Sequence, residues 1–142
     1  MINTENISGK DFYTLQLTSE IECLNEVEDL VDKLVSTYQI DNEVYAIIMT
    51  CLSEIVSNAV NHGNKNDSNK KIYINVEIVN RKKIIFTITD EGEGFDFHQT
   101  LSSLDIANPN NLSGRGLFIV TNLADQCIFN GKGNEVEIHF RI

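Results

Sequence analysis

Hydrophobic and polar residues alternate along several short stretches of the chain, which is the pattern of strands that bury one face. The first such stretch is 11–17. The stretches 72–78 and 84–88 follow the same rule and are separated by the polar turn 80–83. A short connection of this kind predicts an antiparallel hairpin.

Two longer stretches repeat their hydrophobic residues at helical spacing instead. Ser19 is expected to open the first helix, because Glu22 three residues later completes a capping box, and the pattern runs to Tyr38. The second helix is expected to begin near 41–42 and to end near Gly63, a residue type that is common just past helix ends.

The end of the chain predicts a short helix over 116–124 and a second hairpin. The strands of this hairpin are expected at about 126–130 and 135–141, joined by a glycine-containing turn at 131–134. Between 92 and 114 the periodicity fades and Asn, Ser and Pro gather, which is typical of a functional loop such as a lid.

The predicted elements follow the order strand, two helices, two strands, lid, helix, two strands. This order predicts an α+β two-layer sandwich, with a mostly antiparallel mixed sheet and helices on one face. The length of 142 residues, without repeats or a linker, predicts one domain over 1–142.

The chain has a formal net charge of −10 at pH 7 and a hydrophobic content of 42%. This hydrophobic content predicts a packed globule. The negative charge repels phosphate backbones, so no nucleic-acid partner is expected. An anionic ligand would have to rely on backbone N–H groups, a helix N-terminus or a bound cation.

Three cysteines, Cys23, Cys51 and Cys127, lie far apart and form no CxxC motif. They are interpreted as free thiols in a reducing compartment rather than as a zinc site. No apolar run approaches the roughly 20 residues that span a bilayer, and the polar start 1–9 lacks a signal pattern. We therefore expect a cytoplasmic protein without a membrane partner.

A polar row lies along the second predicted helix. Glu54, Asn58 and His62 are spaced at i, i+4 and i+8, so they project from one face. The helix taken alone favours a solvated surface for this row. Asn58 argues slightly against that interpretation, because asparagine is a poor helix former in mid-helix.

Asp90 follows Ile84, Phe86 and Ile88 on the same side of its strand, so the alternation turns its carboxylate toward the helix-covered face. Burying a charge without a partner is costly, so this carboxylate needs a hydrogen-bond donor. The side chain is interpreted either as a cap for the turn before Gly92 or as a ligand-binding group.

The segment Ser113-Gly114-Arg115-Gly116-Leu117 ends the predicted lid and starts the short helix. Free N–H groups and the positive end of a helix dipole suit phosphate at such a position. Arg115 could add a charge-assisted contact or could lie exposed on the lid, and both interpretations stay open.

Taken in order, the segments 54–63 (EIVSNAVNHG), 90–94 (DEGEG) and 113–117 (SGRGL) resemble the N, G1 and G2 boxes of an ATPase superfamily. That GHKL superfamily includes gyrase, the Hsp90 chaperones, histidine kinases and MutL. Five of the eight glycines of the chain lie in these segments, which ties them together as one site. The resemblance implies the histidine-kinase-like ATPase fold, Mg-ATP as the ligand, and phosphoryl transfer or ATP hydrolysis as the reaction.

The resemblance also implies a role for each box residue. Asn58 would ligate Mg²⁺ through its side-chain oxygen, and Glu54 would orient or deprotonate the attacking hydroxyl or water. Asp90 would accept a hydrogen bond from the adenine amino group, whereas the carbonyl of guanine would be repelled there. Gly92 and Gly94 would let the base approach the backbone closely.

Several neighbouring residues have two interpretations. His62 could contact phosphate, but a structural role is favoured. Phe95 and Phe97 could line the pocket for the base, but core packing is favoured. Core packing is also expected for Leu117, Phe118 and Val120.

The size of the chain, its short lid and the sequence GRGLFIV resemble the anti-sigma-factor serine-protein kinases of bacteria. This resemblance implies a sigma-factor partner, a homodimer, and ATP-dependent phosphorylation of a serine on a sulfate-transporter/anti-sigma-antagonist (STAS) domain. Residues 11–39 contain one basic residue, Lys33, so no phosphate-binding cation is assigned there. The alternatives are a non-catalytic ATP-binding module and a detached histidine-kinase-like ATPase domain; the presence of Glu54 favours the enzyme.

Overall fold

The structure is a computed structural model that describes residues 1–96 and 115–142. Its strands form one six-stranded sheet in the order β1-β2-β3-β4-β6-β5, and every pairing is antiparallel. The strands are β1 (Ile2–Ile7), β2 (Lys10–Thr18), β3 (Lys71–Val79), β4 (Lys83–Asp90), β5 (Gln126–Asn130) and β6 (Glu135–Arg141).

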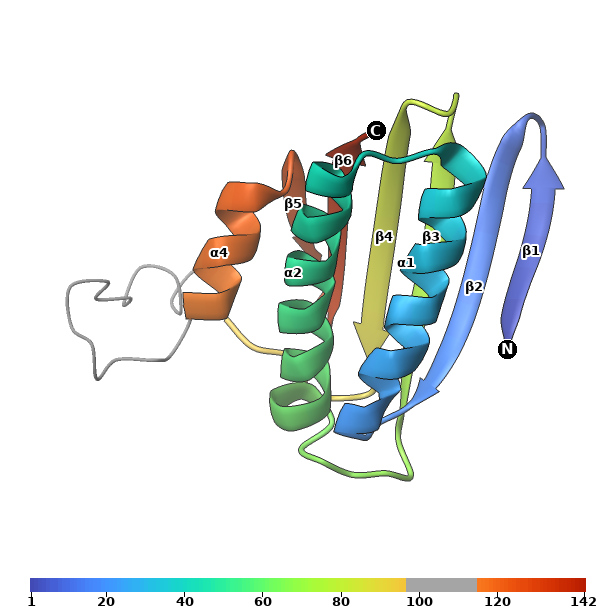
Figure 1. Cartoon of the computed structure of the whole chain (residues 1–142). Helices are drawn as coiled ribbons and strands as arrows, with labels where there is room; N and C mark the ends of the chain where they lie inside the picture. Colours follow the sequence, from blue (N-terminus) through green and yellow to red (C-terminus); the bar gives the residue numbers. More distant parts are fainter. Residues whose placement is uncertain (97–114) are drawn as a thin grey trace.

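The helices of the described part lie on one face of this sheet (Figure 1). They are η1 (Ile21–Cys23), α1 (Leu24–Tyr38), α2 (Asn42–Asn58), its extension η2 (Ala59–Gly63) and α4 (Arg115–Leu123). This arrangement confirms the predicted α+β sandwich, with both predicted hairpins and all three predicted helices in place. The sheet of the described residues is wholly antiparallel rather than mixed as predicted.

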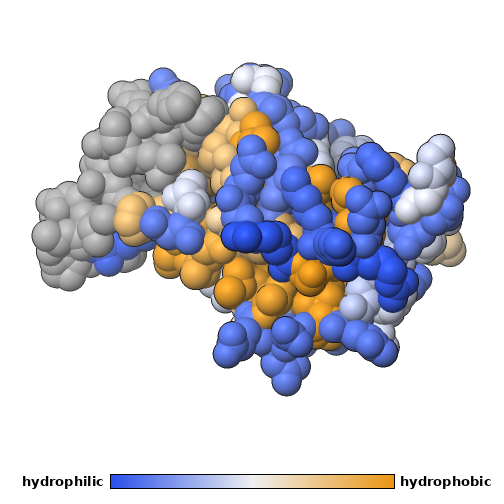
Figure 2. Space-filling model, turned by 90° about the horizontal axis from the view of Figure 1, so that it is seen from above, coloured by the Kyte–Doolittle hydropathy of each residue, from blue (hydrophilic) through white to orange (hydrophobic). Residues whose placement is uncertain are grey.

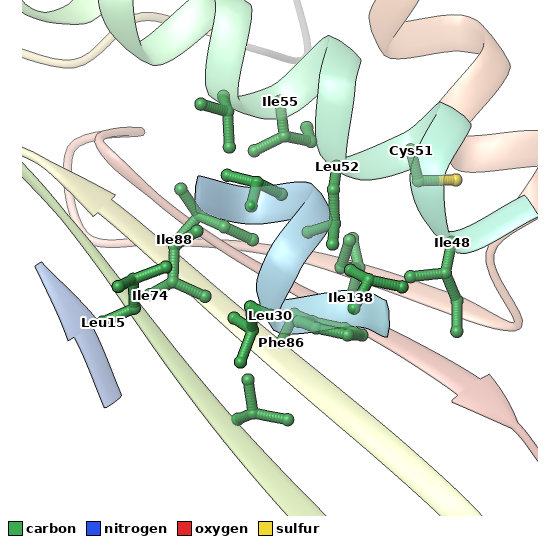
Figure 3. Packing of buried hydrophobic residues seen from close by; sticks show 14 of the residues in the cluster. Leu15, Leu30, Ile48, Cys51, Leu52, Ile55, Ile74, Phe86, Ile88 and Ile138 are labelled. Atoms are coloured by element: carbon green, nitrogen blue, oxygen red, sulfur yellow. The ribbon is translucent and has the colours of Figure 1, made fainter. Parts of the chain in front are cut away.

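The core lies between the helices and the sheet, where alternate side chains along β2, β3 and β4 are buried. On β4 these are Ile84, Phe86 and Ile88, each at most 2% exposed. Figure 3 shows Leu30 of α1 and Leu52 of α2 packed over the strands. Because Asp90 continues the buried row of β4, the core sets the direction of its carboxylate.

Strand β1 was not predicted, because its side chains are almost all exposed and give no alternating pattern. Backbone pairing with β2 holds it in place, with Ile7 opposite Lys10 across a two-residue turn. Both turn residues, Ser8 and Gly9, have positive φ angles of 53° and 79°. Such a serine-glycine pair is a hairpin signal that could have revealed the strand.

The predicted capping box at the start of the first helix is wrong. Ser19 instead continues the pairing of β2 with the start of β3, since its N–H donates to the carbonyl of Lys70 at 3.2 Å. Its hydroxyl is buried and caps no helix, and the α-helix begins only at Leu24, after the 3₁₀ turn η1. The chain first has to leave the sheet, and the short turn makes that change of direction.

A hydrogen-bonded chain of side chains fastens α1 to the outer strands. The Tyr38 hydroxyl donates to Asp11 at 2.6 Å, so the Tyr13 hydroxyl, 2.8 Å away, donates to Tyr38. Asn6 of β1 donates to the same carboxylate. The donors Tyr38 and Asn6 hold the pKa of Asp11 below its ordinary value.

One stretch, Asn42–Gly63, is long and apolar enough to cross a membrane by length and composition, with a mean hydropathy of 1.3. The prediction that no apolar run has this length is therefore wrong. Core helices of soluble proteins pass the same test. Here the stretch packs its apolar side on the sheet and on α1 and α4.

Some large hydrophobic side chains stay at the surface, and hydrophobic patches lie among hydrophilic ones in the view from above (Figure 2). Three of the exposed side chains lie on α4, namely Phe118, Ile119 and Leu123, each at least 37% exposed. The core position predicted for Phe118 is therefore wrong, whereas Leu117 and Val120 are buried as predicted. The helix points Phe118 to the surface, while Leu117 and Val120 point to the core.

The three cysteines are free thiols, as predicted. Cys23 and Cys51 are buried and Cys127 is partly buried. Burial raises the pKa of each thiol to about 11, so all three are protonated and poorly reactive near neutral pH.

Candidate functional site

A pocket of about 560 Å³ opens between the helices and the ends of β4 and β6. This volume lies in the range of small-molecule sites. Residues from all three predicted boxes line it, together with an apolar wall. The lining residues are Glu54, Ile55, Asn58, Ala59, His62, Gly63, Ile88, Asp90, Gly94, Phe95, Gly116, Leu117, Phe129, Gly133, Asn134 and Val136.

The polar row of α2 and η2 faces this pocket. Glu54 and Asn58 are partly buried in its lining, and His62 lies at its exposed end. On the other side of the helix, Leu52 and Val56 are fully buried and anchor it to the core. The row therefore forms one wall of a pocket rather than a fully solvated surface.

The helix ends in a π-turn, Ala59–Gly63, in which the N–H of Asn64 donates to the carbonyl of Ala59 at 2.8 Å. Such wide turns are uncommon and often mark functional sites. The helix ends at Gly63 as predicted, but the expected reason is wrong, because Gly63 does not have the positive φ of a C-terminal glycine.

Gly63 is needed instead for a close approach of Asp90. A Cβ atom added at Gly63 would overlap the Asp90 carboxylate. A Cβ at Gly92 would overlap the backbone carbonyl of Gly63. Gly92 does not itself line the pocket, yet it lets the loop after β4 pack on the end of the helix.

Asp90 is the last residue of β4 and presents its carboxylate to the pocket. Its Oδ1 accepts the N–H of Gly92 at 2.7 Å, so the turn-stabilising interpretation is also correct. Burial raises the pKa of the carboxyl, and the Gly92 hydrogen bond and the positive charges of Lys132 and Lys70 only partly oppose this. Oδ1 therefore has a protein donor, and Oδ2, which lies beside Gly63, has none among the described residues.

The turn between β5 and β6 closes the pocket beside the second box. Gly94 has a φ of +83°, and a Cβ there would overlap the backbone carbonyl of Lys132. Phe95 meets Phe129 edge to face, with ring centroids 6.0 Å apart. Phe95 is 42% exposed and lines the pocket, so its predicted core packing is wrong. Phe97 lies outside the described residues.

The first turn of α4 packs directly against Glu54 in the lining of the pocket. A Cβ at Gly116 would overlap the Glu54 carboxylate, so this glycine lets α4 approach the catalytic candidate. Leu117 is 3% exposed and adds to the apolar lining. Arg115 begins α4 next to these residues. Ser113 and Gly114 lie outside the described residues, and their roles stay predictions.

The oxygen atoms that line the pocket fit a cation that is coordinated partly by the protein and partly by the phosphates of a ligand. In residues 1–96 and 115–142, no group of three His, Cys, Asp or Glu side chains could hold a metal ion. Asn58 and Glu54 supply oxygen atoms one helical turn apart in the lining. Mg²⁺ commonly binds through one or two protein oxygens while phosphate and water complete its shell.

Sequence reasoning missed two asparagines of this site, Asn64 and Asn134, and the apolar wall opposite the polar row. In the sequence, Asn64 directly follows the predicted end of the second helix, and Asn134 lies in a predicted turn. The side chains of both bind the backbone at the end of β4. Only the three-dimensional pairing of distant segments reveals them, since each residue alone is an ordinary turn former.

The contact between Gly63 and Asp90 can be tested by a double-mutant cycle. Gly63→Ala should lower the free energy of unfolding by about 1–3 kcal/mol, because its methyl group overlaps the carboxylate. In an Asp90→Ala background the same change should cost about 0.5–3 kcal/mol less. Urea unfolding of the four proteins measures both values, and an equal cost in the two backgrounds would show that no such contact exists.

Comparison with known proteins shows which family the chain belongs to. The family model described as histidine kinase-like ATPase domain matches residues 17–140. The chain is 33% identical over 90 residues to an anti-sigma F factor of Geobacillus sp. (strain WCH70), covering 62% of this chain and 61% of that protein. It is 36% identical over 81 residues to one of Shouchella clausii (strain KSM-K16), covering 56% and 55%.

The chain also resembles a solved structure of the RsbU and RsbW domains of a Mycobacterium tuberculosis protein. The TM-score is 0.60 at 17% sequence identity, over 90% of this chain and 31% of that one. At this identity the likeness concerns the fold alone. The matches to the anti-sigma F factors span less than two thirds of their length. The family match covers nearly the whole chain, which therefore belongs to the histidine kinase-like ATPase domain family.

Proposed function

We propose that this chain binds Mg-ATP and transfers the γ-phosphate to a serine of a protein partner, as a kinase of the anti-sigma-factor type. The observation that carries the proposal is the Asp90 carboxylate in a pocket that Glu54 and Asn58 also line. The similarity to proteins named anti-sigma F factor supports the choice of branch.

The base of ATP fits the Asp90 end of the pocket. The free oxygen of Asp90 would accept a hydrogen bond from the 6-amino group of adenine. Ile55, Ile88 and Val136 would cover the faces of the base, and the edge of Phe95 would flank it. Guanine would place a carbonyl against the carboxylate, so the pocket should prefer ATP.

The phosphates would extend toward Asn58 and the first turn of α4. Asn58 would be the protein ligand of Mg²⁺, which neutralises phosphate charge and orients the γ-phosphate when bound. Backbone N–H groups near Arg115 and Gly116 offer an anion site at the helix N-terminus. Because the chain carries a net charge of −10, these local groups must supply the attraction.

Glu54 would act as the general base, one helical turn from Asn58. It would accept the proton of the attacking serine hydroxyl while the serine oxygen forms its bond to the γ-phosphorus. The bond between that phosphorus and the oxygen bridging to the β-phosphate would break, and ADP would leave. Gly116 keeps space for the Glu54 carboxylate beside the reacting groups.

The protein substrate is proposed to be an anti-sigma antagonist with a STAS domain, and the regulated protein a sigma factor, in the cytoplasm. A homodimer is proposed with them. The exposed side chains Phe118, Ile119 and Leu123 support a protein partner, because clustered surface hydrophobics commonly mark interaction sites. They lie on α4, the helix whose first turn lines the nucleotide pocket.

Asp90→Asn should abolish the preference for ATP. The amide offers a donor to the adenine amino group, so Mg-ATP affinity should fall at least about tenfold, and wild-type affinity for Mg-GTP should be much weaker than for Mg-ATP. The variant should stay folded, because a neutral amide avoids the cost of burying a charge, the same desolvation that raises the pKa of Asp90. Isothermal titration calorimetry measures the affinities.

The matched control is Asp41→Asn, which changes an exposed aspartate at the far end of α2. It should bind both nucleotides as the wild type does. Equal binding of ATP and GTP by the wild type would overturn the adenine assignment.

Glu54→Ala should keep ATP binding and lose phosphoryl transfer by a factor of about 100 or more, because the general base is removed. Labelled ATP is incubated with candidate STAS-domain proteins, and any phosphoserine is mapped. Glu43→Ala, an exposed change on the same helix, is the control and should transfer normally.

Transfer by Glu54→Ala at the wild-type rate would show that Glu54 is not the base. Wild-type protein that binds ATP and phosphorylates no candidate would favour the non-catalytic binding module instead. A phosphohistidine product would favour the detached histidine-kinase-like domain.

A further inference from the structure

Two asparagines outside the three boxes hold the backbone of Asp90 and Glu91 from opposite sides. We infer that Asn64 and Asn134 are positioning residues for the nucleotide base, acting through Asp90. This inference rests on the proposed ATP site and deepens it. The two residues together are called the asparagine clamp below.

Asn134 extends the sheet by one residue pair beyond the ladder of β4 and β6. Its backbone carbonyl accepts the N–H of Asp90 at 3.0 Å. Its side-chain amide donates to the carbonyl of Asp90 at 2.9 Å. The side chain thus takes the place of a backbone donor in an antiparallel pair, at the point where regular pairing ends with Thr89 and Glu135.

Asn64 holds the next peptide from the helix side and is completely buried. Its Oδ1 accepts the N–H of Glu91 at 2.9 Å, and its Nδ2 donates to the carbonyl of Lys71 at 3.0 Å. The π-turn that ends the helix places Asn64 at this point. The clamp therefore links the helix that carries Glu54 and Asn58 to the strand that carries Asp90.

The clamp matters because Asp90 is a strand end followed by a loop, where backbone ordinarily frays. Among the described residues its carboxylate has one hydrogen-bond donor, the N–H of Gly92, which belongs to that same loop. Fixing the Asp90 and Glu91 peptides holds the Asp90 side chain in place in the lining of the pocket. A shift of the strand end would misalign the hydrogen bond to the base, whose strength falls steeply with angle.

A positioning role and a merely structural role predict different losses. If the clamp only stabilised the fold, its removal would weaken every ligand of the pocket alike or none. If it positions Asp90, its removal should weaken ligands that carry adenine and spare ligands that consist of phosphates alone. Magnesium tripolyphosphate, which has no base, separates the two.

The experiment compares wild type, Asn134→Ala, Asn134→Asp and Asn64→Asp in calorimetric titrations with Mg-ATP and with magnesium tripolyphosphate. Each Asn134 variant loses the donor to Asp90, and Asn64→Asp loses the donor to Lys71 but keeps an acceptor for Glu91. We expect Mg-ATP affinity to fall about 3- to 10-fold, the factor that one hydrogen bond is worth, with tripolyphosphate affinity unchanged.

The matched control is Asn69→Ala, an exposed asparagine in the same loop as Asn64. It should bind both ligands as the wild type does. Asn134 is only partly buried, so its variants carry the test if Asn64→Asp does not fold. Hydrogen exchange of the Asp90 and Glu91 amides should also speed up in the clamp variants and not in the control.

Unchanged Mg-ATP affinity in folded Asn134 variants would overturn the inference, and so would an equal fall for tripolyphosphate. A wild-type protein that binds no Mg-ATP would overturn the proposed function itself, and the inference with it. The wild-type titration therefore tells the two failures apart.

Discussion

The partly buried carboxylate of Asp90 is the constraint on which the rest of the site depends. Desolvation disfavours its charge and raises its pKa, so the fold must hold a group that water would otherwise solvate. It does so with one backbone donor, from Gly92, and leaves the other oxygen without a donor among the described residues. A ligand that brings its own donor, as adenine does, would complete the missing interaction.

Three structural features follow from the need to bring this carboxylate close to the helix that carries Glu54 and Asn58. Gly63 and Gly92 leave no side chain in the contact. The π-turn Ala59–Gly63 widens the end of the helix where the contact is made. The strand end is then fixed from both sides by side-chain amides. The proposed base site and the proposed phosphate site are thus parts of one hydrogen-bonded unit.

The fold could be predicted wherever one face of an element is buried, because burial leaves a periodic pattern. The buried rows of β3 and β4 gave the hairpin and the direction of Asp90. Strand β1 left no such pattern, since its side chains are exposed and backbone pairing holds it. The capping box failed at Ser19 because pairing with Lys70 across the sheet outweighed the local helix signal.

The site was predictable where its residues lie on one helix or strand, and not where residues distant in the sequence come together in the fold. Glu54, Asn58 and His62 lie on one helix, so their spacing predicted one wall of the pocket. Asn64 and Asn134 bind the strand end across 27 and 44 residues of sequence, and local reasoning sees only turn formers there. Phe95 is apolar, which favoured the core, yet the glycine turns beside it leave it at the pocket mouth.

The most direct test of this account is a comparison of two nucleotides whose bases differ at the group proposed to face Asp90 and in the proton on the neighbouring N1. Inosine triphosphate replaces the 6-amino group of ATP with a carbonyl and keeps the ribose and all three phosphates. The account predicts that the wild-type chain binds Mg-ATP at least about 100-fold more tightly than Mg-ITP, since a site built to pair with a donor rejects its replacement. Equal dissociation constants for the two nucleotides would contradict it.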